Sequence, residues 1–343
     1  MALRPKLEFF RFKLESREGE YKTFRNFAIE ELNQRRSSSD AQIMTKLYEH
    51  FMNSLVTDKA KVNSLKKQLK LIRNNANKYL VHRPNVDYGN NLIYGVINGG
   101  RFGRDGMMSD SRSDVDEGAA FGKNKTILRY YYFLLYLPLD HNEGCFIIHS
   151  NSKQETITDV FKMYVSRLFR GEKYKMPTLS MFCPLSFQRE FQEQAIVKSL
   201  EFKQTCMDNG VFTNDGIRIE NNHYDVKIEI IPHDDNISLQ NRGGVRQMLH
   251  ALGLFRGNNN ILRLADFNSQ KMTVKDSVTK SDRTFNLNDE EIDVIPVVYL
   301  ENRINRYNAD GTPNFEDLNT LCQNLLQGEV LPEIRPDLYE NEQ

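Results

Sequence analysis

Residues 6–15 (KLEFFRFKLE) alternate apolar and charged side chains, a pattern typical of a half-buried strand. The segments 24–32 and 40–55 instead repeat apolar residues at steps of three and four, which predicts two amphipathic helices. Residues 58–80 (DKAKVNSLKKQLKLIRNNANKYL) continue that spacing, so a third helix is predicted, antiparallel to the second. Its expected apolar stripe consists of Val62, Leu65, Leu69, Ile72 and Ala76.

From residue 91 the pattern changes. The segments LIYGVI, TILRYYYFLLYLPL and GCFIIHS are apolar runs of the kind found in strands, and the turn-rich DHNEG joins the last two as a hairpin. A helix is predicted over 155–169, followed by irregularly mixed strands and helices. We therefore predict an α+β fold with mostly antiparallel pairing. Residues 1–90 are expected to form a helical N-terminal part that begins with one strand, and residues 91–343 a β-rich core. One domain or two are both compatible with this pattern.

The composition is that of a globular protein. Of the 343 residues, 39% are hydrophobic and 27% charged, which gives enough apolar surface for a core. The four cysteines are far apart and show no metal-binding spacing, so free thiols in a reducing compartment are expected. The longest apolar run, near 130–139, is far shorter than the roughly 20 residues of a membrane span. We expect a cytoplasmic protein that does not contact a membrane.

The charge is unevenly distributed, although its total is zero. Between Asp58 and Arg83 there are eight cations and one acid. On the predicted third helix, four of these cations lie within a sector of roughly 60°, at 100° per residue. Such a face suits the phosphates of a nucleic acid or an acidic surface of a partner protein, and an ordinary solvated face is the alternative. The four candidate residues are Lys59, Lys66, Lys70 and Arg73.

Two further regions carry polar residues that are candidates for binding. Arg242 and Arg246 lie around a short predicted helix at 244–254, and we include them among the phosphate- or partner-binding candidates. Residues 98–125 form a Gly-rich and then acidic connection that lacks the GxxxxGK[ST] form of a phosphate loop. A mobile surface loop is expected there, and a role in binding remains open.

One pattern fits a catalytic site. Nine residues separate Asp215 from the sequence Asp225-Val226-Lys227. In nucleases of the PD-(D/E)xK type, two such acids hold a divalent metal and the lysine activates water. On a strand, Asp225 and Lys227 share one face. A solvent-facing hairpin produces the same string, so a Mg²⁺-dependent nuclease is the alternative to a binding protein without a cofactor.

The block LIYGVINGGRFGRDG, followed by LRYYYFLLYLPLDHNEGCFIIHS and a helix, resembles a pattern in uncharacterised bacterial proteins encoded beside phage-defence genes. It covers Leu92 to Phe169. The resemblance implies a context, antiviral defence, and transfers no catalytic residue. It favours a sensing or interaction module that contacts nucleic acid or a partner protein, such as the product of a neighbouring defence gene.

Overall fold

The structure is a computed structural model in which the chain forms two compact units. Met1–Pro184 and Val297–Gln343 make the first unit, and Leu185–Pro296 makes the second. The expected boundary near residue 90 falls inside the first unit. The residues that the structure describes are 4–73, 77–108, 119–152, 154–187, 195–207, 211–212, 218–219, 223–231, 269–276, 282–286, 298–301, 303–308 and 311–339.

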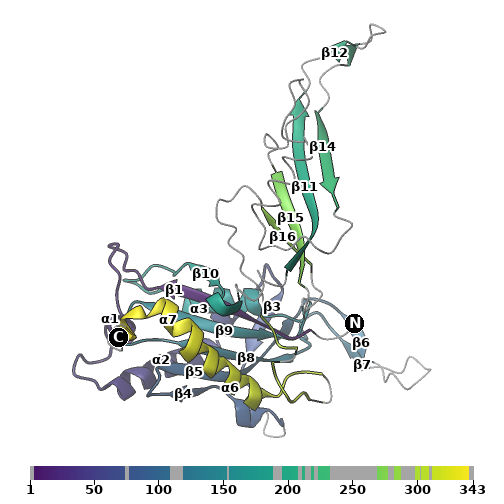
Figure 1. Ribbon diagram of the computed structural model, residues 1–343. Helices are drawn as coiled ribbons and strands as arrows, with labels where there is room; N and C mark the ends of the chain where they lie inside the picture. Colours follow the sequence, from purple (N-terminus) through teal and green to yellow (C-terminus); the bar gives the residue numbers. More distant parts are fainter. Residues whose placement is uncertain are drawn as a thin grey trace. The chain divides into compact units, whose positions relative to one another are not determined.

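A nine-stranded antiparallel sheet forms the centre of the first unit (Figure 1). Its strand order is β10-β1-β9-β8-β5-β3-β2, with β17 paired to β1 and β4 paired to β5. This sheet confirms the predicted α+β class with mostly antiparallel pairing. The strands are β1 (Lys6–Lys13), β2 (Lys61–Val62), β3 (Lys67–Lys70), β4 (Asn85–Asp87), β5 (Leu92–Arg101), β8 (Arg129–Tyr136), β9 (Glu143–Ser150), β10 (Leu179–Phe182) and β17 (Val298–Tyr299).

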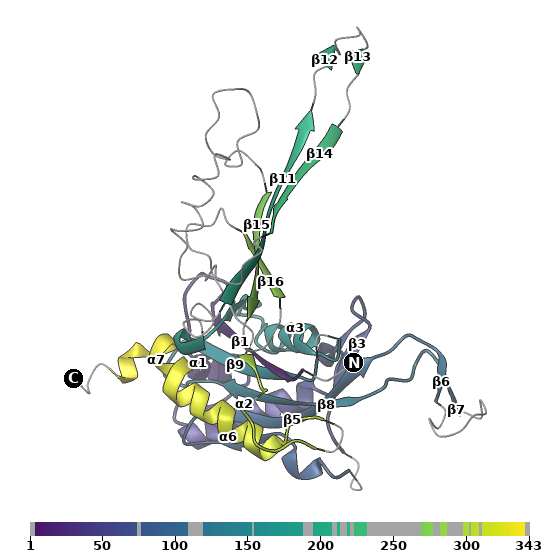
Figure 2. The same cartoon turned by 45° about the vertical axis from the view of Figure 1, so that its right-hand side comes forward.

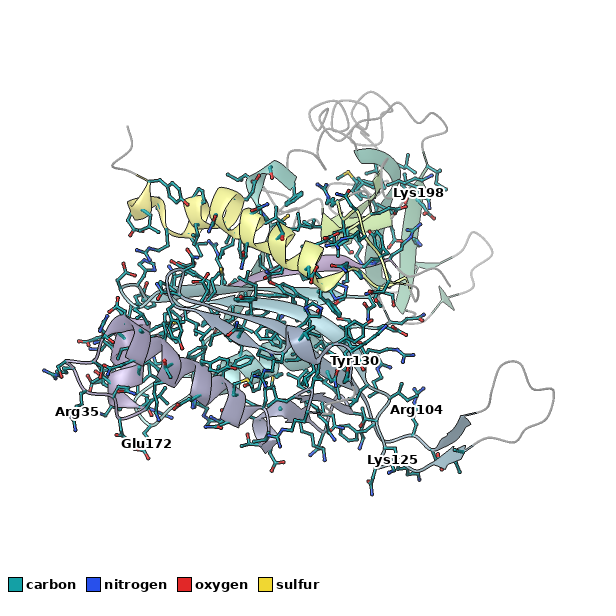
Figure 3. All side chains as sticks on the ribbon, turned by 90° about the horizontal axis from the view of Figure 1, so that it is seen from below. Arg35, Arg104, Lys125, Tyr130, Glu172 and Lys198 are labelled. Carbon is teal, nitrogen blue, oxygen red and sulfur yellow. The ribbon has the colours of Figure 1, made fainter. Side chains whose placement is uncertain are left out.

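Helices cover both faces of this sheet. On one face, α1 (Phe24–Glu30), α2 (Asp40–Ser54) and α3 (Thr158–Leu168) pack on alternate strand residues such as Phe133. On the other face lie α6 (Phe315–Leu325) and α7 (Leu331–Ile334), and Figure 3 shows α2 and α6 on opposite sides of the sheet. Tyr132, next to Phe133, donates a hydrogen bond to Asn319 of α6 at 2.6 Å. Burial on both faces explains why β8 is apolar along most of its length.

The predicted helix over residues 58–80 is wrong. This segment forms a 3₁₀ turn, η1 (Asp58–Ala60), the strands β2 and β3, and a second 3₁₀ turn, η2 (Leu80–His82). Lys66 has a φ of 51° in the turn that joins the two strands, and its N–H bonds to Asn63 O at 3.2 Å. β3 pairs with β5, some thirty residues further on. The local apolar spacing is compatible with a helix, but this distant pairing decides the structure.

The expectation of a helical N-terminal part is therefore also not supported. The helices at 24–32 and 40–55 are present as α1 and α2, and Ser39 with Gln42 forms a capping box at the second. However, four strands of the central sheet, β1 to β4, come from the first 90 residues. None of the helices among the described residues is long and apolar enough to cross a bilayer.

The connection expected at 98–125 is partly β structure. β5 continues to Arg101, and β6 (Gly106–Met108) pairs with β7 (Ala119–Phe121). Residues 109–118 lie outside the described residues. The second unit contains a four-stranded antiparallel sheet of order β14-β11-β15-β16 and a two-stranded ribbon, β12 with β13 (Figure 2). These strands are β11 (Ala195–Met207), β12 (Val211–Phe212), β13 (Arg218–Ile219), β14 (His223–Ile230), β15 (Ser269–Asp276) and β16 (Asp282–Asn286).

The three cysteines whose side chains the structure describes agree with the prediction that the cysteines are thiols. Cys145, Cys183 and Cys322 are buried, and none of the described residues forms a disulfide bond. Burial raises the pKa of the Cys145 and Cys322 thiols far above the ordinary value, which keeps both protonated.

Candidate nucleic-acid interface

Three adjoining hollows lie on the first unit, around the segment between α2 and β3. Their volumes are about 310, 590 and 640 Å³. The first and second share Asp58 and Lys61 in their linings, and the second and third share Lys59 and Arg167, so the hollows adjoin and are taken together as one depression. We name it the basic groove, because seven cations line it: Arg17, Lys59, Lys61, Lys70, Arg73, Arg167 and Arg170.

Strand alternation directs the lysines of the β2–β3 hairpin to different places. Lys67 and Leu69 are buried and face α3, whereas Lys70 is exposed and lies on the opposite face of β3. Lys61 of β2 is paired with Gln68, so it shares that opposite face. Its ammonium lies 4.9 Å from the centroid of the Phe102 ring, a cation–π distance. The hairpin thus presents Lys61 and Lys70 to the groove.

Helix α3 holds this hairpin at both of its ends, and Figure 2 shows α3 beside β3. Near the N-terminus of α3, Lys67 Nζ donates to Asp159 at 2.7 and 2.8 Å and to Thr156 O at 3.0 Å. Near its C-terminus, the Arg167 guanidinium donates to Lys61 O at 2.9 Å and to Lys59 O at 3.4 Å. These bonds fix the groove wall to the core of the unit.

The groove cations have little internal compensation. Among the described residues, none of the seven forms an ion pair. Three acids line the groove, and the carboxylate of one, Glu31, already accepts from the N–H groups of Glu172 and Lys173 at 3.0 and 2.6 Å. Burial lowers the pKa of Lys59, because a desolvated ammonium without a carboxylate is unfavourable. A bound anion would relieve that cost.

His50 lies in the wall of the largest hollow. Its Nε2 lies 2.9 Å from Leu168 O, and because a carbonyl can only accept, Nε2 carries the proton. Burial is the main cause of a lowered pKa for His50, and the nearby Lys59 lowers it further. His50 is therefore neutral at pH 7 and adds no acid or charge to the groove.

A second group of exposed cations lies at the turn of the β2–β3 hairpin, and we call it the basic rim. Gly103 N–H bonds to Lys123 O at 2.8 Å, and Gly103 lies against the Lys66 side chain. Figure 3 shows Arg104 and Lys125 at the same end of the unit. The rim consists of Lys66, Arg101, Arg104, Lys123 and Lys125, all exposed.

The structure brings three of the four candidate cations together, although not on a helix. Lys59, Lys70 and Arg73 line the groove, and Lys66 belongs to the rim. Sequence reasoning missed Arg17, Arg167 and Arg170, which come from distant segments and carry no local signal. It counted Lys61 in the basic run but did not select it as a site residue. It also missed the rim residues Arg101, Arg104, Lys123 and Lys125, whose signal was their position on both sides of the acidic stretch.

The nuclease candidates are only partly described. Asp215, Arg242 and Arg246 lie outside the described residues. Asp225 lies on β14 opposite Thr205 of β11. On the same strand, Lys227 forms an ion pair with Glu201 at 2.8 Å, and this partner raises the pKa of the exposed Lys227. The metal-dependent site therefore stays a sequence-based prediction.

Comparisons with protein families, with curated proteins and with solved structures find no match for this chain. The fold and the groove define it as an α+β protein with a central antiparallel sheet and a basic surface depression.

Proposed function

We propose that the protein binds nucleic acid through the phosphates of the backbone, in the basic groove. The observation that carries the proposal is the gathering of seven cations in one depression, without carboxylate partners among the described residues. Phosphates that replace condensed counterions at such cations release those ions, which favours binding. The arginines add planar donors that match phosphate oxygens.

Some cations elsewhere on the unit do have carboxylate partners, and this contrast supports a functional groove. Lys13 pairs with Glu143 at 3.2 Å, and Lys175 pairs with Glu15. An ordinary solvated face of a protein with zero net charge is expected to mix both signs in this way. The groove, with seven cations and three acids, departs from an even mixture, and we attribute this excess to a requirement for an anion.

A sensing or interaction module in bacterial defence is the cellular role that the sequence resemblance favours, and it stays a prediction. An acidic protein surface would use the same cations, so it is the competing partner for the groove. Phosphate chains and acidic proteins differ in one measurable respect. A nucleic acid binds with a salt dependence set by counterion release from its phosphates.

Binding of a fluorescent 20-nucleotide strand tests the proposal. In Lys59→Gln/Lys70→Gln, two groove charges are removed while long side chains are kept, so affinity at about 0.1 M salt should fall roughly tenfold or more. The matched control is Lys13→Gln/Lys175→Gln, which removes two charges outside the groove and should bind within twofold of the wild type. Equal losses in the two variants, or no binding by the wild type, would refute the proposal.

A further inference from the structure

We infer that the basic groove accepts a single strand of nucleic acid and discriminates against a duplex. This inference rests on the proposed function and names the form of its ligand. It follows from where the cations lie: they line hollows of about 310–640 Å³, and two of the seven, Lys59 and Arg167, are partly buried while the other five are exposed. The lowered pKa of Lys59 agrees with a recessed ammonium.

The stiffness of a duplex separates the two forms. Duplex DNA has a persistence length of about 150 base pairs, and its phosphates lie on a convex cylinder. Such a surface meets ridges and flat faces, but it cannot enter a series of small hollows without bending. A single strand rotates freely about its backbone bonds, so successive phosphates can reach the partly buried Lys59 and Arg167 as well as the exposed cations beside them.

The course of the groove adds a second argument. Its lining passes from Lys70 and Arg73 at the end of β3, past η1, to Arg167 and Arg170 at the C-terminal end of α3. Four elements, η1, β2, β3 and α3, and the segment after β1 therefore supply the cations, and adjoining hollows place them close together. A flexible chain can follow this sequence of hollows from one to the next.

The bases are expected to contribute little. Among the described residues, Phe27 is the one Phe, Tyr or Trp in the groove lining, and it is only 1% exposed. The other aromatic ring in the lining, among the residues that the structure describes, belongs to His50, which is partly buried. Binding of single strands usually combines a basic channel with aromatic platforms, so a groove without an exposed platform should tolerate any sequence.

The β2–β3 hairpin is an element that a duplex could contact, because a two-stranded ribbon fits the major groove. β2 is only two residues long, however, and the tip at 63–66 carries a single cation, Lys66. Lys66 has its side chain against Gly103. The tip therefore supplies one cation to a duplex.

The test compares one 20-nucleotide strand with the blunt duplex of the same sequence, at equal salt. The single strand should bind at least tenfold more tightly, and Lys59→Gln/Lys70→Gln should lose most of that binding. Lys66→Gln, at the hairpin tip, should change it less than twofold. Inorganic polyphosphate should displace the strand.

Each contrary result has a distinct meaning. A duplex that binds as tightly as the strand, or that loses affinity in Lys66→Gln, overturns this inference and leaves the proposed function standing. Failure of polyphosphate to displace the strand also overturns it, because bases and not phosphates would then hold the strand. If neither form binds, the proposed function itself fails.

Discussion

Lys67 and Asp159 form an ion pair that joins β3 to the first turn of α3. Lys67 Nζ lies 2.7 and 2.8 Å from the two carboxylate oxygens, and the Lys67 side chain is 5% exposed whereas that of Asp159 is 41% exposed. The aspartate also lies where the helix dipole favours a negative charge. The pair thus holds the hairpin that carries Lys61 and Lys70, while one of its two partners is buried.

Removing Asp159 should lower the stability more than removing Lys67. Asp159→Ala leaves a buried ammonium with only the Thr156 carbonyl, so we expect a loss of about 2–4 kcal/mol in the free energy of unfolding. Lys67→Met keeps the buried chain and leaves a carboxylate that water can reach, so its loss should be smaller, about 1 kcal/mol. Urea unfolding at pH 7 measures both. A larger loss in Lys67→Met would show that the buried charge is not the dominant cost.

The backbone at Gly95 should tolerate no side chain. Gly95 in β5 has a φ of 145°, and an added Cβ would lie 2.7 Å from Pro84 Cα and 2.9 Å from Arg83 C. Both contacts are backbone atoms that cannot rotate away, so Gly95→Ala should cost about 2–4 kcal/mol. Gly122→Ala is the matched control, because nothing lies within 4 Å of its added Cβ. Similar thermal stability of the two variants would contradict this account.

Most of the central sheet was predictable, and the physical reason is visible in particular residues. Tyr131, Phe133 and Leu135 lie in one apolar run that is buried on both faces, and no polar residue interrupts it. The helices α2 and α3 follow strong 3.6-residue periodicity. The prediction for residues 58–80 was wrong because Val62 and Leu69 fit a helical stripe and a hairpin equally well. The choice between the two depends on pairing with β5.

The groove was predictable only in part for a related reason. A run of cations is a local signal, so Lys59, Lys70 and Arg73 were found. Arg17 and Arg167 line hollows together with Lys59 only because the tertiary fold brings distant segments of the chain together, and no local pattern encodes that arrangement.

Buried His149 should make stability depend on pH. Neither of its ring nitrogens has a hydrogen-bond partner among the described residues, and burial lowers the pKa of His149 to about 3. The unfolded value is about 6.5, so the unfolded chain binds more protons between pH 3 and 6.5. This contribution to stability is complete above pH 6.5 and declines as the pH falls toward 3.

Between pH 7 and pH 5, the wild type should therefore lose about 2 kcal/mol more than His149→Leu, which has no titrating group at this position. Urea unfolding at the two pH values gives the change in the free energy of unfolding for each protein. Comparing these two changes removes any cost of the substitution itself, because that cost is present at both pH values. Parallel pH dependence of the two proteins would show that His149 does not titrate differently on folding.

The salt dependence of strand binding tests the central claim most directly. A plot of log K against log salt concentration should be linear for the wild type, with a slope no steeper than about −5 if all seven groove cations contact phosphates of a single strand. Lys59→Gln/Lys70→Gln should reduce the magnitude of the slope by about 1.4, whereas Lys13→Gln/Lys175→Gln should leave it unchanged. If the groove variant keeps the wild-type slope, or the control variant changes it equally, phosphates do not bind in the basic groove.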